Sequence, residues 1–425
     1  MNIRFYNGKI LPTTNEMEIL EKELWVVGNK IEHIGDKKET EIKWDREINL
    51  KGNLLIPGFK NAHTHSGMTF LRSLADDYPL KEWLNKKVFP KETQLVPEDI
   101  YWLSKLAILE YLTSGITANF DMYFHAEQIA QASFECGFRT VIAGDLNDFT
   151  NSVEKLEENF ITFNNNSKYD GLISYKLGFH AEYTTSKEPL KDLAKLSKKY
   201  NAPVWTHNSE TLEEVNSCIK RNGMTPTVYL DSLGIYDNGG GGYHCVYLSE
   251  EDMKIFKEKE LFVVTNPSSN IKLASGIARI DKFLNKNIPV AIGTDGPASN
   301  NALDMFREMF LVSGLTKVAA KDASVVNGDE VLKMATVNGA KAMGLENCDA
   351  LEVGKLADMV VIDLKQPNMQ PINNISKNIV YSGSKSNVKL TMINGKILYE
   401  DGEFHIGDSI EKTYKEANKI VKRIK

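Results

Sequence analysis

The sequence predicts an α/β fold, a (β/α)8 barrel of the TIM type joined to a small β-sandwich that both ends of the chain build. Three observations predict it. The 425 residues suit a barrel of about 250 residues or more plus a smaller module. From residue 54 onward, short apolar or β-branched runs alternate with longer segments of helical periodicity. Both ends of the chain instead carry strand-like runs separated by tight-turn signals.

Eight strand-like runs with helical segments between them favour a closed barrel. The predicted strands are residues 54–58, 116–121, 140–146, 173–180, 202–208, 242–248, 261–267 and 289–295. The predicted helices between them include residues 97–113, 126–136, 190–200, 211–222, 250–257 and 277–285. Several of these helices end at Gly or Asn, as helix C-caps require.

Four consecutive glycines, Gly239 to Gly242, precede Tyr243. A phosphate-binding loop would also need a following Lys and a Ser or Thr that opens a helix, and neither stands there. We therefore expect a flexible connection near the site rather than a phosphate cradle.

Tight-turn dipeptides lie between the strand-like runs at the two ends of the chain. Asn7-Gly8, Gly28-Asn29 and Asn394-Gly395 are typical of two-residue hairpins that need positive φ. Residues 1–56 and 352–408 are therefore predicted to form two halves of one β-sandwich, with the barrel at residues 57–351 between them. Apolar residues at helical spacing predict a last helix over residues 409–425.

Composition excludes several classes of function. The formal net charge is -6, which argues against a nucleic-acid-binding protein, because such proteins usually present a basic face. No apolar run approaches the roughly 20 residues that a membrane span needs. The N-terminal residues lack the pattern of a secretion signal, and the four cysteines are scattered, as in a reducing compartment. We expect a cytoplasmic protein.

Metal-binding side chains recur where the predicted strands end. The residues are His63 and His65 after the first strand, His180 on the fourth, His207 on the fifth, His244 on the sixth and Asp295 on the eighth. In a (β/α)8 barrel the carboxyl ends of the strands face the active site. Five of the eight histidines are therefore expected at one rim, which core packing alone does not explain. The other three, His33, His125 and His405, are expected to be surface or structural residues.

The paired histidines predict a metal site. His63 and His65 are two residues apart, so on extended chain both imidazoles project to one side and can reach one ion. His207 and Asp295 would complete a shell that leaves a position open for water. One divalent metal per chain is expected; Zn²⁺ suits this donor set best and Fe²⁺ also fits. Such an ion lowers the pKa of bound water to about 7.

Glu210 follows His207 by three residues. A carboxylate there can reach both the activated water and a substrate without binding the metal, as a proton shuttle must. The same residue could also serve as an acid in the first turn of the predicted helix 211–222. The two roles are compatible.

Seven segments carry a resemblance that covers nearly the whole chain. They are residues 55–68, 71–77, 82–84, 121–125, 265–270, 293–301 and 354–358. In them the chain resembles the amidohydrolase superfamily, which implies a TIM-like metal-dependent hydrolase barrel. Within that superfamily it is similar to the deaminases of 5'-methylthioadenosine and S-adenosylhomocysteine, in the branch that also holds chlorohydrolases and cytosine deaminases.

The resemblance implies a role for each residue of the predicted metal site. His63, His65, His207 and Asp295 would hold the metal, and Asp295 would also accept a proton from the nucleophilic water. Glu210 would protonate the ring nitrogen beside the reacting carbon. In addition, His244 would polarise the nucleophile and the developing tetrahedral centre.

The resemblance also implies the substrate and its contacts. An adenosine-type nucleoside (5'-methylthioadenosine, S-adenosylhomocysteine, adenosine or 5'-deoxyadenosine) would yield the inosine analogue and ammonia. Glu92 would hold the ribose hydroxyls, His180 would contact the nucleoside and Trp83 would line the pocket. Gly144 and Lys155 stand where the resemblance expects arginines, which favours adenosine-type substrates in general over S-adenosylhomocysteine in particular. The resemblance further suggests a homo-oligomer.

Three other functions remain open at this point. The first is a deaminase or chlorohydrolase of a free base or triazine, such as guanine, cytosine or an s-triazine; it would need no ribose contact from Glu92. The second is a two-metal amide hydrolase of the dihydroorotase type, which would need a carboxylated lysine where His180 stands, whereas Lys176 lies four residues earlier. The third is an inactive barrel with a binding or assembly role, although no predicted metal ligand is missing.

Overall fold

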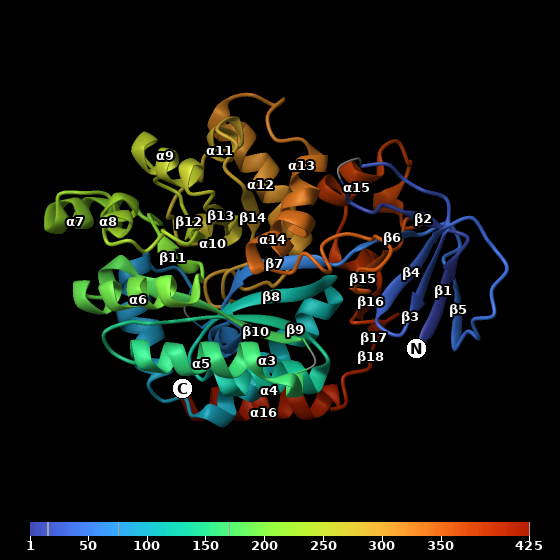
Figure 1. Ribbon diagram of the computed structural model, residues 1–425, viewed down its shortest axis with the longest axis horizontal. Coiled ribbons are helices and arrows are strands. Elements are labelled where there is room, and N and C mark those ends of the chain that lie inside the picture. The colour runs from blue at the N-terminus through green and yellow to red at the C-terminus, as the bar shows by residue number, and fades with distance from the viewer. Residues whose placement is uncertain (15–16, 75, 170, 425) are drawn as a thin grey trace.

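The computed structural model describes residues 1–14, 17–74, 76–169 and 171–424. Ala75 of the segment 71–77 and Lys425 of the predicted last helix lie outside the described residues, as do residues 15, 16 and 170 of the predicted modules. An eight-stranded parallel barrel forms one body, and two smaller sheets lie together at one side of it (Figure 1). The barrel and the two terminal sheets confirm the predicted fold class.

The barrel strands follow one another in chain order, and each pairs with the next in parallel. They are β7 (Phe59–Thr64), β8 (Ile116–Met122), β9 (Arg139–Ala143), β10 (Ile173–Ala181), β11 (Val204–Asn208), β12 (Gly240–His244), β13 (Phe262–Thr265) and β14 (Val290–Ile292). The Asp295 N–H donates to the His63 carbonyl oxygen over 3.0 Å. This bond brings the carboxyl end of β14 beside β7.

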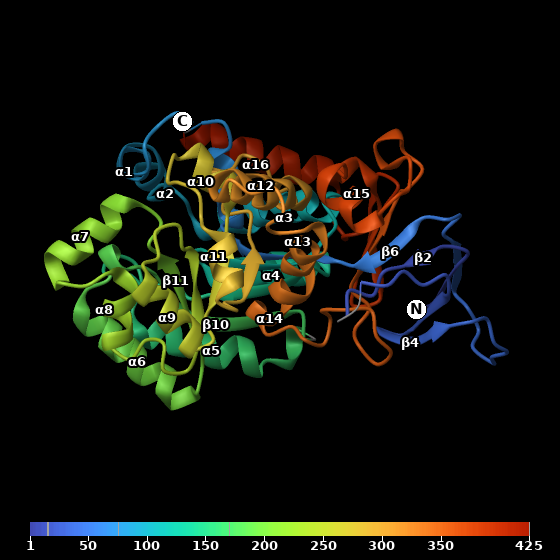
Figure 2. The same ribbon diagram turned by 90° about the horizontal axis from the view of Figure 1, so that it is seen from above.

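Helices surround the barrel on its outside (Figures 1 and 2). Apolar side chains of these helices and of the barrel strands belong to one buried cluster. The longer helices are α3 (Pro97–Thr113), α4 (Ala126–Cys136), α5 (Val153–Asn165), α6 (Lys187–Tyr200), α7 (Leu212–Asn222), α9 (Glu250–Glu258), α12 (Met305–Ala320) and α16 (Ile410–Ile424). The shorter ones are α1 (Leu80–Trp83), α2 (Phe89–Glu92), α8 (Pro226–Ser232), α10 (Pro267–Lys272), α11 (Ile280–Asn285), α13 (Gly328–Lys333), α14 (Gly339–Met343) and α15 (Ile375–Tyr381). A 3-10 turn, η1 (Ser66–Leu71), follows the paired histidines.

The prediction that residues 54–58 form the first barrel strand is wrong. Leu54–Pro57 is β6, which pairs with β15 (Met359–Ile362) and β2 (Lys9–Ile10) in a terminal sheet. The first barrel strand is β7, which begins at Phe59. Residues 54–64 are all buried, so their hydrophobic pattern does not show where the chain leaves one sheet for the other.

The glycine run does not form a flexible connection near the site. Gly240 to Gly242 belong to β12, at its amino end and therefore opposite the active-site rim. A Cβ on Gly240 would lie 1.9 Å from the Val204 carbonyl oxygen, and one on Gly241 would lie 2.4 Å from that of Phe262. The glycines therefore let β11, β12 and β13 approach one another closely.

Two terminal sheets pack across a shared apolar core. One has the order β4-β3-β1-β5, and the other has the order β18-β17-β16-β15-β6-β2. The remaining strands are β1 (Asn2–Tyr6), β3 (Glu23–Val27), β4 (Lys30–Gly35), β5 (Arg46–Asn49), β16 (Val388–Ile393), β17 (Lys396–Glu400) and β18 (Glu403–Phe404). Both ends of the chain contribute strands, but the exact module boundaries at residues 56, 351 and 408 stay predictions.

Two of the three predicted hairpin turns are confirmed. Gly28-Asn29 joins the antiparallel pair β3 and β4, and Asn394-Gly395 joins β16 and β17. The hairpin predicted at Asn7-Gly8 is wrong, because β1 and β2 belong to different sheets. Asn7 still has the positive φ that the dipeptide suggests, at 57°, so the turn redirects the chain from one sheet to the other.

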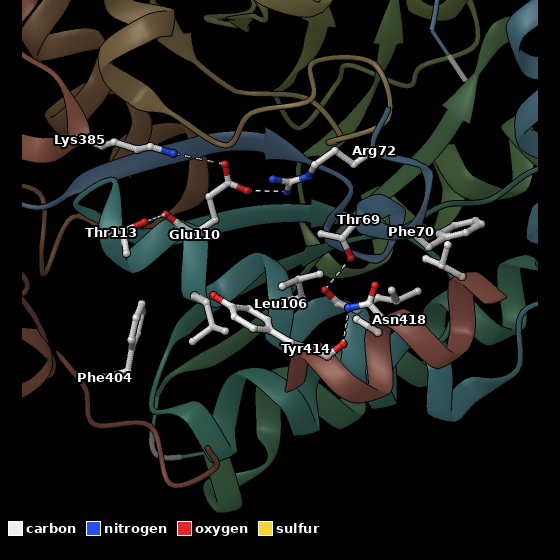
Figure 3. A pocket seen from close by; sticks show the side chains of 14 residues that line it. Thr69, Phe70, Arg72, Leu106, Glu110, Thr113, Lys385, Phe404, Tyr414 and Asn418 are labelled. Carbon is white, nitrogen blue, oxygen red and sulfur yellow. Dashed lines mark hydrogen bonds and ion pairs between the residues drawn. The ribbon is translucent and has the colours of Figure 1, made fainter. Parts of the chain in front are cut away.

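The last helix, α16, lies against α3, and a cavity of about 430 Å³ lies between them (Figure 3). Glu110 at its edge binds Arg72 over 2.5 Å, and Lys385 lies 4.0 Å from the same carboxylate. None of the predicted site residues lines this cavity. Among the described residues, no helix combines the length and apolar character needed to cross a bilayer.

Candidate metal centre and active site

The four predicted metal ligands lie together at the carboxyl rim of the barrel. The ring centroid of His63 lies 4.8 Å from that of His65 and 4.9 Å from that of His207. Asp295 Oδ1 lies 3.6 Å from His63 Nε2 and 3.2 Å from His65 Nε2. Residues more than 200 positions apart in the chain are thus within reach of one ion.

The donor set fits a divalent metal ion. Ligand atoms of His63, His65 and Asp295 all lie within 4.8 Å of one another, and so do those of His63, His207 and His244. His63 is fully buried, yet neither of its ring nitrogens has a hydrogen-bond partner among the described residues. A buried polar group without a partner costs stability unless a ligand satisfies it. These donors could therefore hold a divalent cation, with His63 at the centre of the set.

Backbone carbonyls orient two of the imidazoles. His65 Nδ1 donates to the Met122 carbonyl oxygen over 2.5 Å, and His207 Nδ1 donates to that of His180 over 2.7 Å. Each bond leaves Nε2 as the free nitrogen that can bind a metal, which is the usual arrangement around ligating histidines.

The carboxylate of Asp295 is held by three donors. Its Oδ2 accepts from Ser269 Oγ over 2.5 Å and from Ser299 Oγ over 2.8 Å, and its Oδ1 accepts from the Gly296 N–H over 2.7 Å. Burial raises its pKa, but the hydrogen bond from His65 and the nearby imidazoles outweigh burial and hold the pKa well below its usual range. The group is therefore fixed as an ionised acceptor.

Glu210 and His244 lie beside this centre. His244 Nε2 is 3.9 Å from both Glu210 Oε2 and Asp295 Oδ2, while its Nδ1 bonds with Asn270 Oδ1 over 2.7 Å. Burial raises the pKa of Glu210 above its ordinary value, which is the direction that favours a proton donor. His244 and Asp295 both have positive φ, 68° and 58°, a costly backbone conformation that is common at functional sites.

Glu214 supports Glu210 and was missed in the sequence. Its carboxylate accepts the N–H of Ser209 over 2.9 Å and the N–H of Glu210 over 2.7 Å. Ser209 has a φ of 51°, so these two bonds hold the strained turn that places Glu210. Four-residue spacing from Glu210 was the only available signal, and it is also typical of an ordinary helix start.

We expect Glu214→Gln to lower kcat about tenfold with little change in KM or metal content. The amide keeps one acceptor oxygen but turns an NH2 group toward the second backbone N–H, so one buried donor loses its partner. Steady-state kinetics and metal analysis would check this, with exposed Glu213→Gln as the matched control. An unchanged kcat would show that the turn holds Glu210 without Glu214.

The three predicted substrate contacts, His180, Glu92 and Trp83, differ in how they relate to the metal centre. His180 lies next to the centre, with its ring centroid 4.9 Å from that of His207, and burial lowers its pKa to about 4. Glu92 Oε1 accepts from Tyr123 Oη over 2.5 Å, and burial raises its pKa to about 6 although His65 lowers it. Trp83 is 4% exposed; its Nε1 has no hydrogen-bond partner among the described residues, and no described contact joins it to the histidines.

Two residues bear on the alternatives raised by the sequence. Lys176 Nζ lies 2.7 Å from where a Cβ on Gly344, at the end of α14, would stand, so the amino group points to α14 and gives no support to a two-metal site at His180. Lys155 is turned to the surface, where it pairs with Glu158 at 3.1 Å and Glu127 at 3.6 Å. Lys155 stands at the second position where the resemblance expects an arginine, and its amino group is directed away from the centre.

Comparisons with known proteins agree with this geometry. Residues 54–398 match the model of the Amidohydrolase family, so the chain belongs to that family of hydrolases. A 5-methylthioadenosine/S-adenosylhomocysteine deaminase of Thermoanaerobacter pseudethanolicus is 39% identical over 100% of this chain and 99% of its own. A 5'-deoxyadenosine deaminase of Methanocaldococcus jannaschii is 40% identical over 94% of this chain and 96% of its own.

A crystal structure of an adenosine deaminase from Xanthomonas campestris with bound zinc is similar throughout. It covers 99% of this chain and 98% of its own with a TM-score of 0.93 at 30% identity. A triazine hydrolase variant shares the fold at a TM-score of 0.90 over 99% of both chains, at 18% identity.

Proposed function

We propose that this chain is a hydrolytic deaminase that converts an adenosine-type nucleoside to the inosine analogue and ammonia. One divalent metal ion, for which Zn²⁺ suits best, would be held by His63, His65, His207 and Asp295. The observation that carries the proposal is the meeting of these donors around fully buried His63, whose ring nitrogens have no hydrogen-bond partner among the described residues. The names of the full-length relatives support the nucleoside as substrate.

The ion, when bound, supplies Lewis-acid activation of a water molecule. Asp295 accepts a proton from that water, since its carboxylate is held ionised by serine and backbone donors. Glu210 donates a proton to the purine ring nitrogen beside the carbon that bears the amino group, and His244 orients the nucleophile between the two carboxylates. Addition of water oxygen to that carbon is followed by a second proton transfer to the amino nitrogen, and ammonia leaves.

An ammonia-release assay tests the proposal directly. The panel is adenosine, 5'-methylthioadenosine, 5'-deoxyadenosine, S-adenosylhomocysteine, guanine and cytosine, given to metal-replete protein and to chelator-treated protein. We expect release from at least one nucleoside, loss after chelation and recovery with Zn²⁺. Release from free bases alone, or from none of the panel, would overturn the proposal.

Homo-oligomerisation and a cytoplasmic location stay predictions. Light scattering after gel filtration tests the oligomeric state.

We expect Glu92→Gln to raise KM for the best nucleoside at least about tenfold, because the charged acceptor of a hydroxyl bond is lost. The same variant should change kcat less than KM, since Glu92 is not among the groups proposed to transfer protons. Deamination kinetics with the nucleoside and its 2',3'-dideoxy analogue would check the assignment. For the dideoxy analogue, which lacks both hydroxyls, we expect the variant and the wild type to have the same KM. Equal loss for both substrates would contradict the ribose contact.

A further inference from the structure

One inward-facing carboxyl group at the rim has no part in the proposed reaction. On β9 and the residues after it, Val141 and Ala143 face the barrel interior, whereas Ile142 and Leu146 face the helices. Strand pairing continues past the end of β9, because the His180 N–H donates to the Leu146 carbonyl oxygen over 2.9 Å. By this alternation Asp145 faces the interior at the carboxyl end of the barrel.

The surroundings of Asp145 contain a second acid. Asp145 Oδ1 accepts from Asn151 Nδ2 over 2.5 Å. Burial raises its pKa to about 6, and His65 is near enough to lower it in part. Glu92 accepts a hydrogen bond from Tyr123, just after β8. The charge of His65 lowers the pKa of Glu92 as well. We call the pair Glu92 and Asp145 the acidic side of the site; it adjoins the ends of β8 and β9.

Among the described residues, no Lys or Arg is recorded in an ion pair with Glu92 or Asp145. Lys155 is paired with glutamates at the surface. A side chain at Gly144 cannot be accommodated, since its Cβ would lie 2.8 Å from the Gly178 nitrogen and 2.9 Å from its oxygen. In the part of the barrel that the structure describes, the inward positions at the carboxyl ends of β7 to β14 include no Lys or Arg.

We propose that Asp145 is a specificity-determining residue, which makes the site favour nucleosides with an uncharged or cationic 5' substituent over those with an anionic one. The proposal rests on the proposed function and on Glu92 as the ribose contact. The proposal places the ribose diol at Glu92, beside the end of β8, and the 5' substituent toward the end of β9. A half-buried carboxylate at Asp145 repels an anion there and accepts a hydrogen bond from a hydroxyl or ammonium group.

Three adenosine analogues that differ only at the 5' position test this: 5'-deoxyadenosine (neutral), 5'-amino-5'-deoxyadenosine (cationic) and adenosine-5'-carboxylic acid (anionic). In the wild type we expect kcat/KM for the amine to exceed that for the carboxylic acid at least about tenfold. Asp145→Asn should lower this ratio at least about tenfold. Exposed Asp148→Asn, in the same loop, should leave the ratio unchanged.

The outcomes separate the inference from the function on which it rests. A wild type that prefers the carboxylic acid, or an Asp145→Asn variant with an unchanged ratio, overturns the inference while deamination stands. Equal loss for all three analogues in a variant with a wild-type melting temperature shows a structural role and also overturns it. If Asp145→Asn does not fold, Asp145→Ser is measured in the same way. Failure of the wild type to deaminate any nucleoside overturns the proposed function as well.

Discussion

Glu210→Gln is expected to lower kcat by about 10²- to 10⁴-fold, the usual contribution of a general acid or base. The amide is nearly isosteric and can keep the bond from Ser275 Oγ, which Glu210 Oε1 accepts over 3.0 Å. It cannot deliver a proton to the ring nitrogen. Because Glu210 is not among the proposed metal ligands, the metal content should stay at the wild-type value. Single-turnover kinetics with metal analysis on the same sample measure both quantities.

The control for this prediction is Glu213→Gln. Glu213 lies three residues further on, is exposed and pairs with Lys81 at 2.8 Å, so its loss should leave kcat unchanged. A Glu210→Gln variant that keeps more than about a tenth of wild-type kcat would remove Glu210 from the proton path. One that loses its metal would instead identify Glu210 as a ligand.

The candidate metal ligands could be predicted from the sequence because each lies at or just beyond the carboxyl end of a barrel strand. The strand positions follow from hydrophobic runs, and the barrel rule then places their carboxyl ends together. The two-residue spacing puts His63 and His65 on one side of the chain, but the hydrophobic pattern does not show that this side faces the centre. The pairing of β7 with β8 shifts register between Asn61 and Thr64, and a local irregularity of this kind has no sequence signature apart from the motif itself.

The supporting residues could not be predicted for a different reason. Ser269, Ser299 and Asn270 bind Asp295 and His244, but serine and asparagine are common in loops and helix starts, so composition alone does not distinguish them. The orientation of Asp145 depends on pairing that continues beyond the end of β9. The hydrophobic run predicts a strand over residues 140–146, but only the register of its pairing with β10 settles which face of that strand carries the Asp145 carboxyl group.

Asp295→Asn is expected to have the largest effect of any substitution considered, a fall in kcat/KM of at least about 10⁴-fold. The amide is a weaker metal ligand than a carboxylate and cannot take up the proton from water, so one change removes two functions. In the wild type, Ser269 Oγ, Ser299 Oγ and the Gly296 N–H all donate to the Asp295 carboxylate. The NH2 group of the asparagine would face at least one of these donors. One hydrogen bond of this set would therefore be lost.

Metal-dependent stability separates the two functions of Asp295. In the wild type, an ion that binds only the folded chain raises the melting temperature as its concentration rises above Kd. Asp295→Asn should shift that dependence to higher Zn²⁺ concentrations, whereas exposed Asp401→Asn, the matched control, should not. If the variant lost activity but kept the wild-type Zn²⁺ dependence of its melting temperature, Asp295 would act in proton transfer alone. The metal would then be held by the imidazoles of His63, His65 and His207 without it.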